Sequence, residues 1–330
     1  MQTARQPEPA KLSQIAIMTL CFNNILKLTP ASTGTLEVFD IAQMYVDTYG
    51  VRNIEMQHSH IQSTEESYLK ELKARYDRTQ SKITNINIEF GAMTISAADP
   101  GLRVQAIDLT KRWVDHCVIL GCPRLMLNQG QLTHDNKVWA IDALKKMADY
   151  GRSKGVRIGV ETRGNGGAGG GRGAAAPAAG AAPGAAPAGA AQAPAAGAGA
   201  PPAAGGAGVA GAGAGRGAAA GRGGSESIPT LAVVPAWVLL SEVIQSGKAY
   251  ANVDMGNVGA ESEGELFAAL RTFQPMTTGN THTRVNANWN LARVVKFMTG
   301  PLGYTGLFSI EANGGHEAVR PIYNIVLDAL

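Results

Sequence analysis

The unit that decides the fold reads RLMLNQGQLTHDNKVWAIDALKKMADYGRSKGVRIGVE, over residues 124–161. It begins and ends with short apolar runs, at residues 124–127 and 156–160, which are typical of buried strands. Between these runs, residues 136–153 predict a long amphipathic helix. A strand, a helix and a second strand in this order form the repeating unit of folds with a parallel sheet.

The same alternation of strand and helix recurs along the chain, about once every 30 residues. Eight such pairs predict an α/β fold of the closed (β/α)8 TIM-barrel type. An open doubly wound sheet is the alternative, but it carries a glycine-rich phosphate loop after its first strand, and Cys21-Phe22-Asn23-Asn24 contains no glycine. The expected strands lie at residues 15–20, 51–56, 83–90, 124–127, 156–160, 249–253, 276–281 and 306–310. The expected helices lie at residues 36–49, 64–78, 100–120, 136–153, 234–245, 263–272, 289–298 and 318–330.

A low-complexity tract interrupts this pattern after the fifth strand. Residues 164–224 contain 27 Ala, 22 Gly and 6 Pro, with three Arg and no acidic residue. So few large apolar side chains cannot compensate for the entropy of ordering the chain, so we expect a long disordered Gly/Ala/Pro-rich insertion at residues 164–227. The remainder, residues 15–330, is expected to form a single barrel domain behind a flexible N-terminal segment, residues 1–14.

The charge of the chain argues against a nucleic-acid-binding protein. The formal net charge of +3 comes from the three arginines of the tract, because 29 − 3 = 26 basic residues elsewhere match the 26 acidic residues. No basic face is therefore implied. No apolar run is long and continuous enough to predict a membrane span, and the polar start of the chain does not resemble a secretory signal. We expect a cytoplasmic protein, or a periplasmic one if a signal peptide has been removed.

Four expected strands end in a side chain that can bind a metal ion. They read Gly159-Val160-Glu161-Thr162, Asn252-Val253-Asp254-Met255, Asn280-Thr281-His282-Thr283 and Ser309-Ile310-Glu311-Ala312. These are consecutive strands, and the carboxyl ends of barrel strands form the active face, so the four side chains can converge. Three carboxylates repel one another unless a cation compensates. Oxygen ligands with one nitrogen suit one divalent ion, with Mn²⁺ as the first choice and Mg²⁺, Co²⁺ or Zn²⁺ as alternatives.

These motifs resemble those of the xylose isomerase-like TIM barrel superfamily, the sugar phosphate isomerase/epimerase type. The resemblance implies that Glu161, Asp254, His282 and Glu311 bind one divalent metal ion. It also implies a sugar isomerase or epimerase, in which the catalytic residues Glu161 and Glu311 transfer a proton at a carbon next to a carbonyl, through a metal-stabilised enediolate. The partner is then a small-molecule carbohydrate, with no nucleic acid and no membrane, and the family allows a homodimer.

One departure from the family keeps other activities open. Ketose 3-epimerases of this superfamily carry a substrate-binding His shortly after the sixth-strand Asp, where this chain has Asn257. A lyase or dehydratase of the inosose dehydratase type is therefore the first alternative. An abasic-site endonuclease and an inactive binding barrel are further alternatives, which the six histidines, the neutral barrel and the intact ligand set argue against.

Further polar residues at expected strand ends are candidates for substrate binding. They could contact the hydroxyl or anionic groups of a sugar, and Arg163 and His60 are weaker candidates of the same kind. The predicted substrate-binding residues are Glu55, His58, Asn128, Gln129, Asn257 and Arg284.

Overall fold

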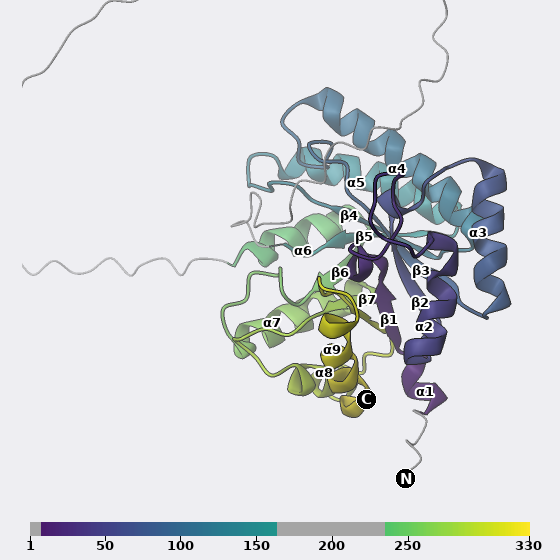
Figure 1. Ribbon diagram of the computed structural model, residues 1–330. Helices are drawn as coiled ribbons and strands as arrows, with labels where there is room; N and C mark the ends of the chain where they lie inside the picture. The colour runs from purple at the N-terminus through teal and green to yellow at the C-terminus, as the bar shows by residue number, and fades with distance from the viewer. Residues whose placement is uncertain (1–7, 164–234) are drawn as a thin grey trace, which may run out of the picture. The chain divides into compact units, whose positions relative to one another are not determined.

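The computed structural model describes residues 8–163 and 235–330, and its strands form one closed barrel (Figure 1). Each strand pairs in parallel with the next, and the last pairs with the first. The predicted (β/α)8 TIM barrel is confirmed. The strands are β1 Ile15–Met18, β2 Asn53–Gln57, β3 Lys82–Ile88, β4 Arg124–Asn128, β5 Arg157–Glu161, β6 Tyr250–Asp254, β7 Thr277–Thr283 and β8 Leu307–Ile310.

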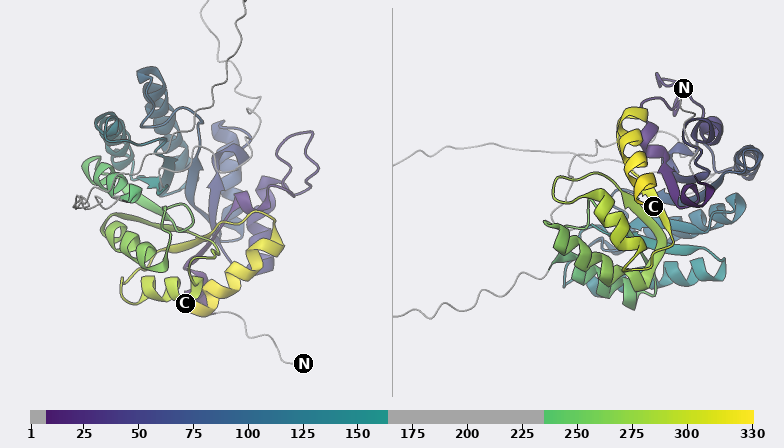
Figure 2. Two further views of the ribbon diagram at one scale, coloured as in Figure 1. Left: turned by 90° about the vertical axis from the view of Figure 1, so that its left-hand side faces the viewer. Right: turned by 90° about the horizontal axis from the view of Figure 1, so that it is seen from below.

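The helices lie outside the strands and surround them (Figures 1 and 2). Their buried apolar side chains form one cluster with the apolar side chains of the strands, which is the main core of the barrel. Within the described residues, no helix is long and apolar enough to cross a membrane. The helices are α1 Pro9–Leu12, α2 Ile41–Tyr49, α3 Glu66–Arg78, α4 Pro100–Leu120, α5 Lys137–Ser153, α6 Ala236–Ser246, α7 Glu263–Phe273, α8 Leu291–Thr299 and α9 His316–Ala329.

Local sequence signals explain where several helices begin and end. The Asp99 side chain accepts a hydrogen bond from the backbone N–H of Gly101 at 2.7 Å, which caps α4 directly before its first-turn proline. Gly50 ends α2 in the left-handed conformation, with φ of 70°, which a glycine adopts without steric cost. The first strand is shorter than predicted, because residues 19–22 turn into a 3₁₀ helix.

Two segments that were predicted to be flexible or disordered lie partly or wholly outside the described residues. The flexible segment predicted at residues 1–14 contains helix α1, and the Ser13 carbonyl accepts a hydrogen bond from Asn53 Nδ2 at 3.0 Å. Residues 1–7 lie outside the described residues. The disordered insertion predicted at residues 164–227 also lies outside them, and the described chain leaves the barrel after β5 and continues in α6.

The interior of the barrel is unusually polar beneath its carboxyl end. Four fully buried polar residues form a layer there and are joined by hydrogen bonds between their side chains: Glu55, Asn85, Asn252 and Asn280. Many TIM barrels fill this space with branched apolar residues. A hydrogen-bonded polar layer here places charged groups directly below the strand ends.

Candidate metal centre

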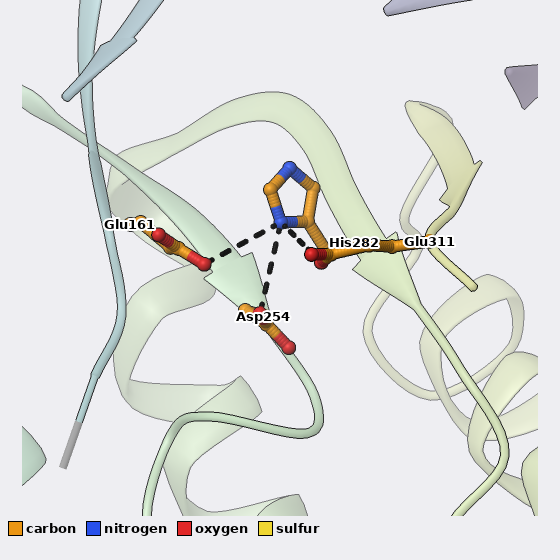
Figure 3. Close-up of side chains that lie close together, drawn as sticks. All are labelled: Glu161, Asp254, His282 and Glu311. Carbon is orange, nitrogen blue, oxygen red and sulfur yellow. Dashed lines mark ion pairs between the residues drawn. The ribbon is translucent and has the colours of Figure 1, made fainter. Parts of the chain in front are cut away.

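The four predicted metal ligands converge at the carboxyl end of the barrel. One ligand atom from each of Glu161, Asp254, His282 and Glu311 lies within 4.8 Å of the others. Asp254 and His282 are directly paired between β6 and β7, and Glu311 follows the last residue of β8. Figure 3 shows Glu161 and Glu311 approaching the imidazole from opposite sides, with Asp254 between them.

The imidazole nitrogen Nδ1 of His282 faces all three carboxylates. It lies 3.1 Å from Glu311 Oε2, 3.7 Å from Asp254 Oδ2 and 3.8 Å from Glu161 Oε1 (Figure 3). The four side chains are buried, and yet Nδ1 has no hydrogen-bond partner among the described residues. A buried nitrogen without a partner, surrounded by carboxylate oxygens, fits the donor set of a divalent cation.

The opposite nitrogen of His282, Nε2, is held by Glu55. Nε2 lies 2.7 Å from Glu55 Oε1, and both residues are at most 1% exposed. Asn85 and Asn280 each donate a side-chain hydrogen bond to Glu55 at 2.9 Å. The sequence predicted that Glu55 contacts substrate hydroxyls, but in this structure its carboxylate lies behind the histidine and accepts hydrogen bonds from side chains of the barrel.

Two arginines bring positive charge to the cluster. Arg284 Nη2 lies 2.7 Å from Asp254 Oδ2 and also contacts Glu311 Oε2. Arg163 donates from Nε to Glu161 Oε2 at 2.8 Å. Arg284 passes directly over Gly256, where a Cβ atom would lie 2.3 Å from Arg284 Cδ. The glycine of the Asp-Met-Gly-Asn motif thus leaves space for the arginine to reach the carboxylates.

Asn257 is also committed to the cluster. Its Nδ2 donates to Asp254 Oδ2 at 2.6 Å and to Glu161 Oε1 at 3.3 Å. Asn257 and Arg284 were both predicted to bind substrate, but in this structure they bind the carboxylates of the predicted metal ligands. Both residues therefore lie at the edge of the cluster.

The charges of the cluster shift the acidity of its members in different directions. Burial and the neighbouring Glu311 carboxylate raise the pKa of Asp254 to about 6. Burial alone would raise the pKa of Glu161, but His282 and Arg163 outweigh it and hold that pKa well below its usual range. Burial would lower the pKa of His282, but the charges of Glu55 and Glu311 raise it well above the usual value. The raised pKa of His282 shows that negative charge surrounds the imidazole, which favours a cation at this place.

A second polar group forms around Glu89, which the sequence analysis missed. Asn128 Nδ2 donates to Glu89 Oε1 at 3.2 Å, and Arg163 Nη2 lies 3.1 Å from the same oxygen. Gln129 Nε2 donates to the carbonyl of Arg163 at 2.9 Å. Glu89 could have been identified as an acidic residue directly after a strand, because β3 ends at Ile88. The sequence analysis predicted that this strand runs to residue 90, so Glu89 fell within it.

His58 and His60, which follow β2, have local partners. His58, a predicted substrate contact, places Nδ1 3.2 Å from the Asn87 carbonyl and packs edge-on against Trp113. His60 is buried and places Nδ1 2.8 Å from the hydroxyl of Thr19. These contacts pack the loop after β2.

Comparison with known proteins agrees with the fold. A family model described as the xylose isomerase-like TIM barrel matches residues 45–176. This match confirms the resemblance that the strand-end motifs predicted. No curated protein matches the sequence.

Several solved structures share the architecture at low sequence identity. The 3-keto-D-glucoside 4-epimerase from E. coli is 10% identical, with a TM-score of 0.59, and the match covers 96% of this chain and 98% of that one. A D-psicose 3-epimerase from Clostridium cellulolyticum H10 is 11% identical, with a TM-score of 0.59 and coverage of 96% and 95%. A probable 3-DHS dehydratase from Bacillus anthracis is 10% identical, with a TM-score of 0.56 and coverage of 96% and 97%. At these identities the likeness shows the fold alone.

Proposed function

We propose that this xylose isomerase-like barrel is a divalent-metal-dependent isomerase or epimerase that acts on a sugar or a sugar derivative. The observation that carries the proposal is the buried set of Glu161, Asp254, His282 and Glu311, whose ligand atoms lie within 4.8 Å of one another. A bound dication, with Mn²⁺ as the first candidate, would polarise a substrate carbonyl and stabilise the enediolate. The epimerases among the similar structures are consistent with a small carbohydrate substrate.

Glu161 and Glu311 are the residues that we propose to transfer the proton. They lie on opposite sides of the cluster, so one can remove a proton from one face of a planar intermediate and the other can return it to the opposite face (Figure 3). The pKa of Glu161 is held below its usual range by His282 and Arg163 against the effect of burial, so the carboxylate is ionised before a substrate binds. Arg163, through its hydrogen bond to Glu161, tunes this acidity.

The group around Glu89 is the proposed binding surface for substrate hydroxyls. Glu89 and Arg163 are each about one-third exposed, and Asn128 joins them. A carboxylate, a guanidinium and an amide offer both donors and acceptors, which is the chemistry that sugar hydroxyl groups require. Among the residues predicted from the sequence, we retain Asn128 as a substrate contact on this basis.

The proposal is tested by hydrogen exchange at the carbon next to the carbonyl. The Mn²⁺-loaded protein is incubated in D₂O with a panel of keto sugars and inososes, and deuterium incorporation is followed by NMR. At least one substrate should exchange. E161Q and E311Q should each reduce the exchange by about 10²-fold or more, the usual range for losing a general base, while E71Q on the exposed face of α3 serves as the matched control.

Two results would contradict the proposal. One is a folded protein that binds no divalent cation, and the other is exchange that persists in both variants at the level of the parent. If only one of the two variants still exchanges, the carboxylate that this variant retains is the one that transfers the proton. That result would replace the two-base scheme with a single base.

A lyase is the second candidate, because of Asn257. Its amide is bound to Asp254 and Glu161, so this position contributes no histidine to hold a ketose as in the 3-epimerase pattern. Loss of water from an inosose or a keto sugar in the same panel, instead of an isomer, would assign the protein to this class.

A further inference from the structure

We infer that Glu55 is the positioning residue of the metal centre, which holds the His282 imidazole so that Nδ1 faces the three carboxylates. This inference rests on the proposed function, in that it assigns a role within the same metal site. Glu55 lies on β2 and His282 on β7, so the two residues are far apart in the sequence. The sequence pattern alone predicted that Glu55 contacts the substrate.

The contact between the two residues is short and fully enclosed. His282 Nε2 lies 2.7 Å from Glu55 Oε1, and the exposed fractions of the two side chains are 1% and 0%. In the described part of the chain, His282 is the one cationic group within 4.0 Å of this carboxylate. A buried carboxylate is costly unless it is paired, so the imidazole N–H is the group that compensates for it.

Glu55 is itself fixed from two sides. Asn280 donates to Oε2 at 2.9 Å, and Asn85 donates to Oε1 at the same distance. Asn280 and His282 lie two residues apart on β7, so both side chains point to the same face of that strand. The pairing of β2 with β3 shifts its register between Ile54 and Glu55, and this shift sets Asn85 opposite Glu55.

These contacts have a consequence for metal binding. With Nε2 donating to Glu55, the lone pair for a metal ion is on Nδ1, which is the nitrogen that faces the carboxylates and has no hydrogen-bond partner in the described part of the chain. The negative charge of Glu55 also makes Nδ1 a stronger electron-pair donor to a metal ion. Removing an outer partner of this kind weakens metal binding by about 10- to 100-fold in known sites.

The decisive experiment compares E55Q with E317Q. Both changes remove one negative charge, but Glu317 lies at an exposed position in the first turn of α9. Mn²⁺ affinity is measured by calorimetry on the full chain. We expect E55Q to bind about 10- to 100-fold more weakly and E317Q to change by less than about threefold. Equal weakening in both variants would reduce the effect to net charge and overturn the inference.

Spectroscopy separates positioning from a general loss of stability. The visible absorption of bound Co²⁺ reports ligand geometry, so it should change in E55Q and stay the same in E317Q. If E55Q does not fold, N85A removes one support and keeps the carboxylate, and we expect about a three- to tenfold loss of affinity with a changed Co²⁺ spectrum. An unchanged spectrum and affinity in a folded E55Q or N85A would contradict the inference.

A measurement without metal distinguishes this inference from the proposed function. The Nε2–H proton of His282 should give a low-field resonance in ¹⁵N-labelled protein, because it is bound to a buried carboxylate, and E55Q should lose it. A parent protein that shows this resonance but binds no dication would refute the proposed function and leave the contact with Glu55 intact. A parent without the resonance would refute the contact itself.

Discussion

Arg284 Nη2 lies 2.7 Å from Asp254 Oδ2, and that same oxygen faces the nitrogen of His282 that is available to a metal ion. A guanidinium therefore already occupies one side of the carboxylate cluster. It stabilises the three acidic groups, but its positive charge also opposes a second cation at close range. The following predictions start from this relationship and from the other buried contacts of the barrel.

Replacing Arg284 should change metal affinity and metal-free stability in opposite directions. R284Q removes the repulsion between guanidinium and cation, so we expect Mn²⁺ to bind about three- to tenfold more tightly. Without metal, the carboxylates lose a counter-charge, and the melting temperature should fall. Calorimetry and thermal unfolding measure the two effects. R293Q is the matched control, since Arg293 pairs with Glu263 at the surface, and weaker Mn²⁺ binding in R284Q would contradict this prediction.

Binding of Mn²⁺ should release protons. The charges of Glu55 and Glu311 raise the pKa of His282 well above its usual value despite burial, so the imidazole is protonated at pH 7 without metal. The histidine nitrogen that binds a metal ion must carry no proton, so the imidazole should release about one proton on metal binding at pH 7. Because burial and Glu311 raise the pKa of Asp254 to about 6, further protons should leave near pH 6, and affinity should fall as the pH falls. Calorimetry in buffers of different ionisation enthalpy counts the protons, and a count of zero at pH 7 would refute this.

His60 should make the fold sensitive to mild acid. Its Nδ1 lies 2.8 Å from the Thr19 hydroxyl, which accepts the Gln57 N–H and has a proton of its own to donate to a neutral ring. Burial, with a contribution from His58, lowers its pKa to about 4. Below pH 6.5 the unfolded chain binds the proton more readily than the folded one, so stability is lost as the pH falls. The site alone should cost ~2 kcal/mol by pH 5.

Urea unfolding of H60Q against the parent at pH 7 and pH 5 tests the His60 prediction. The variant should be less stable at pH 7 but should lose less stability on acidification. H134Q, the same exchange at an exposed position, is the control. Equal losses on acidification in the parent and in H60Q would show that His60 does not couple the fold to pH.

Deleting residues 164–224 should leave the barrel folded. All eight strands lie in the described ranges on either side of this segment, and they close the barrel by pairing with one another. Shortening the connection between β5 and α6 should raise the free energy of unfolding by about 2 kcal/mol, because a shorter loop costs less entropy to close. Chemical unfolding measures this change. Loss of the cooperative transition would show that the segment belongs to the folded core.

The sequence by itself determined the strand and helix order, the closed barrel and the four residues that meet in the cluster proposed to hold a metal ion. Each of these rests on a local pattern: alternating apolar runs identify the strands, and Glu161, Asp254, His282 and Glu311 each follow such a run directly or end it. Parallel strands present their carboxyl ends at one edge, so the convergence of the four residues follows from their order alone.

Only the tertiary structure decided how the remaining polar residues are used. Glu55 was placed at the substrate by its position on a strand, but the register shift beside it and the partners on β3 and β7 set it behind His282. Arg284 reaches Asp254 because Gly256 leaves space on a neighbouring loop. These contacts join strands far apart in the chain, and no local pattern encodes which side chains meet inside a closed barrel, because register and packing across it fix that geometry.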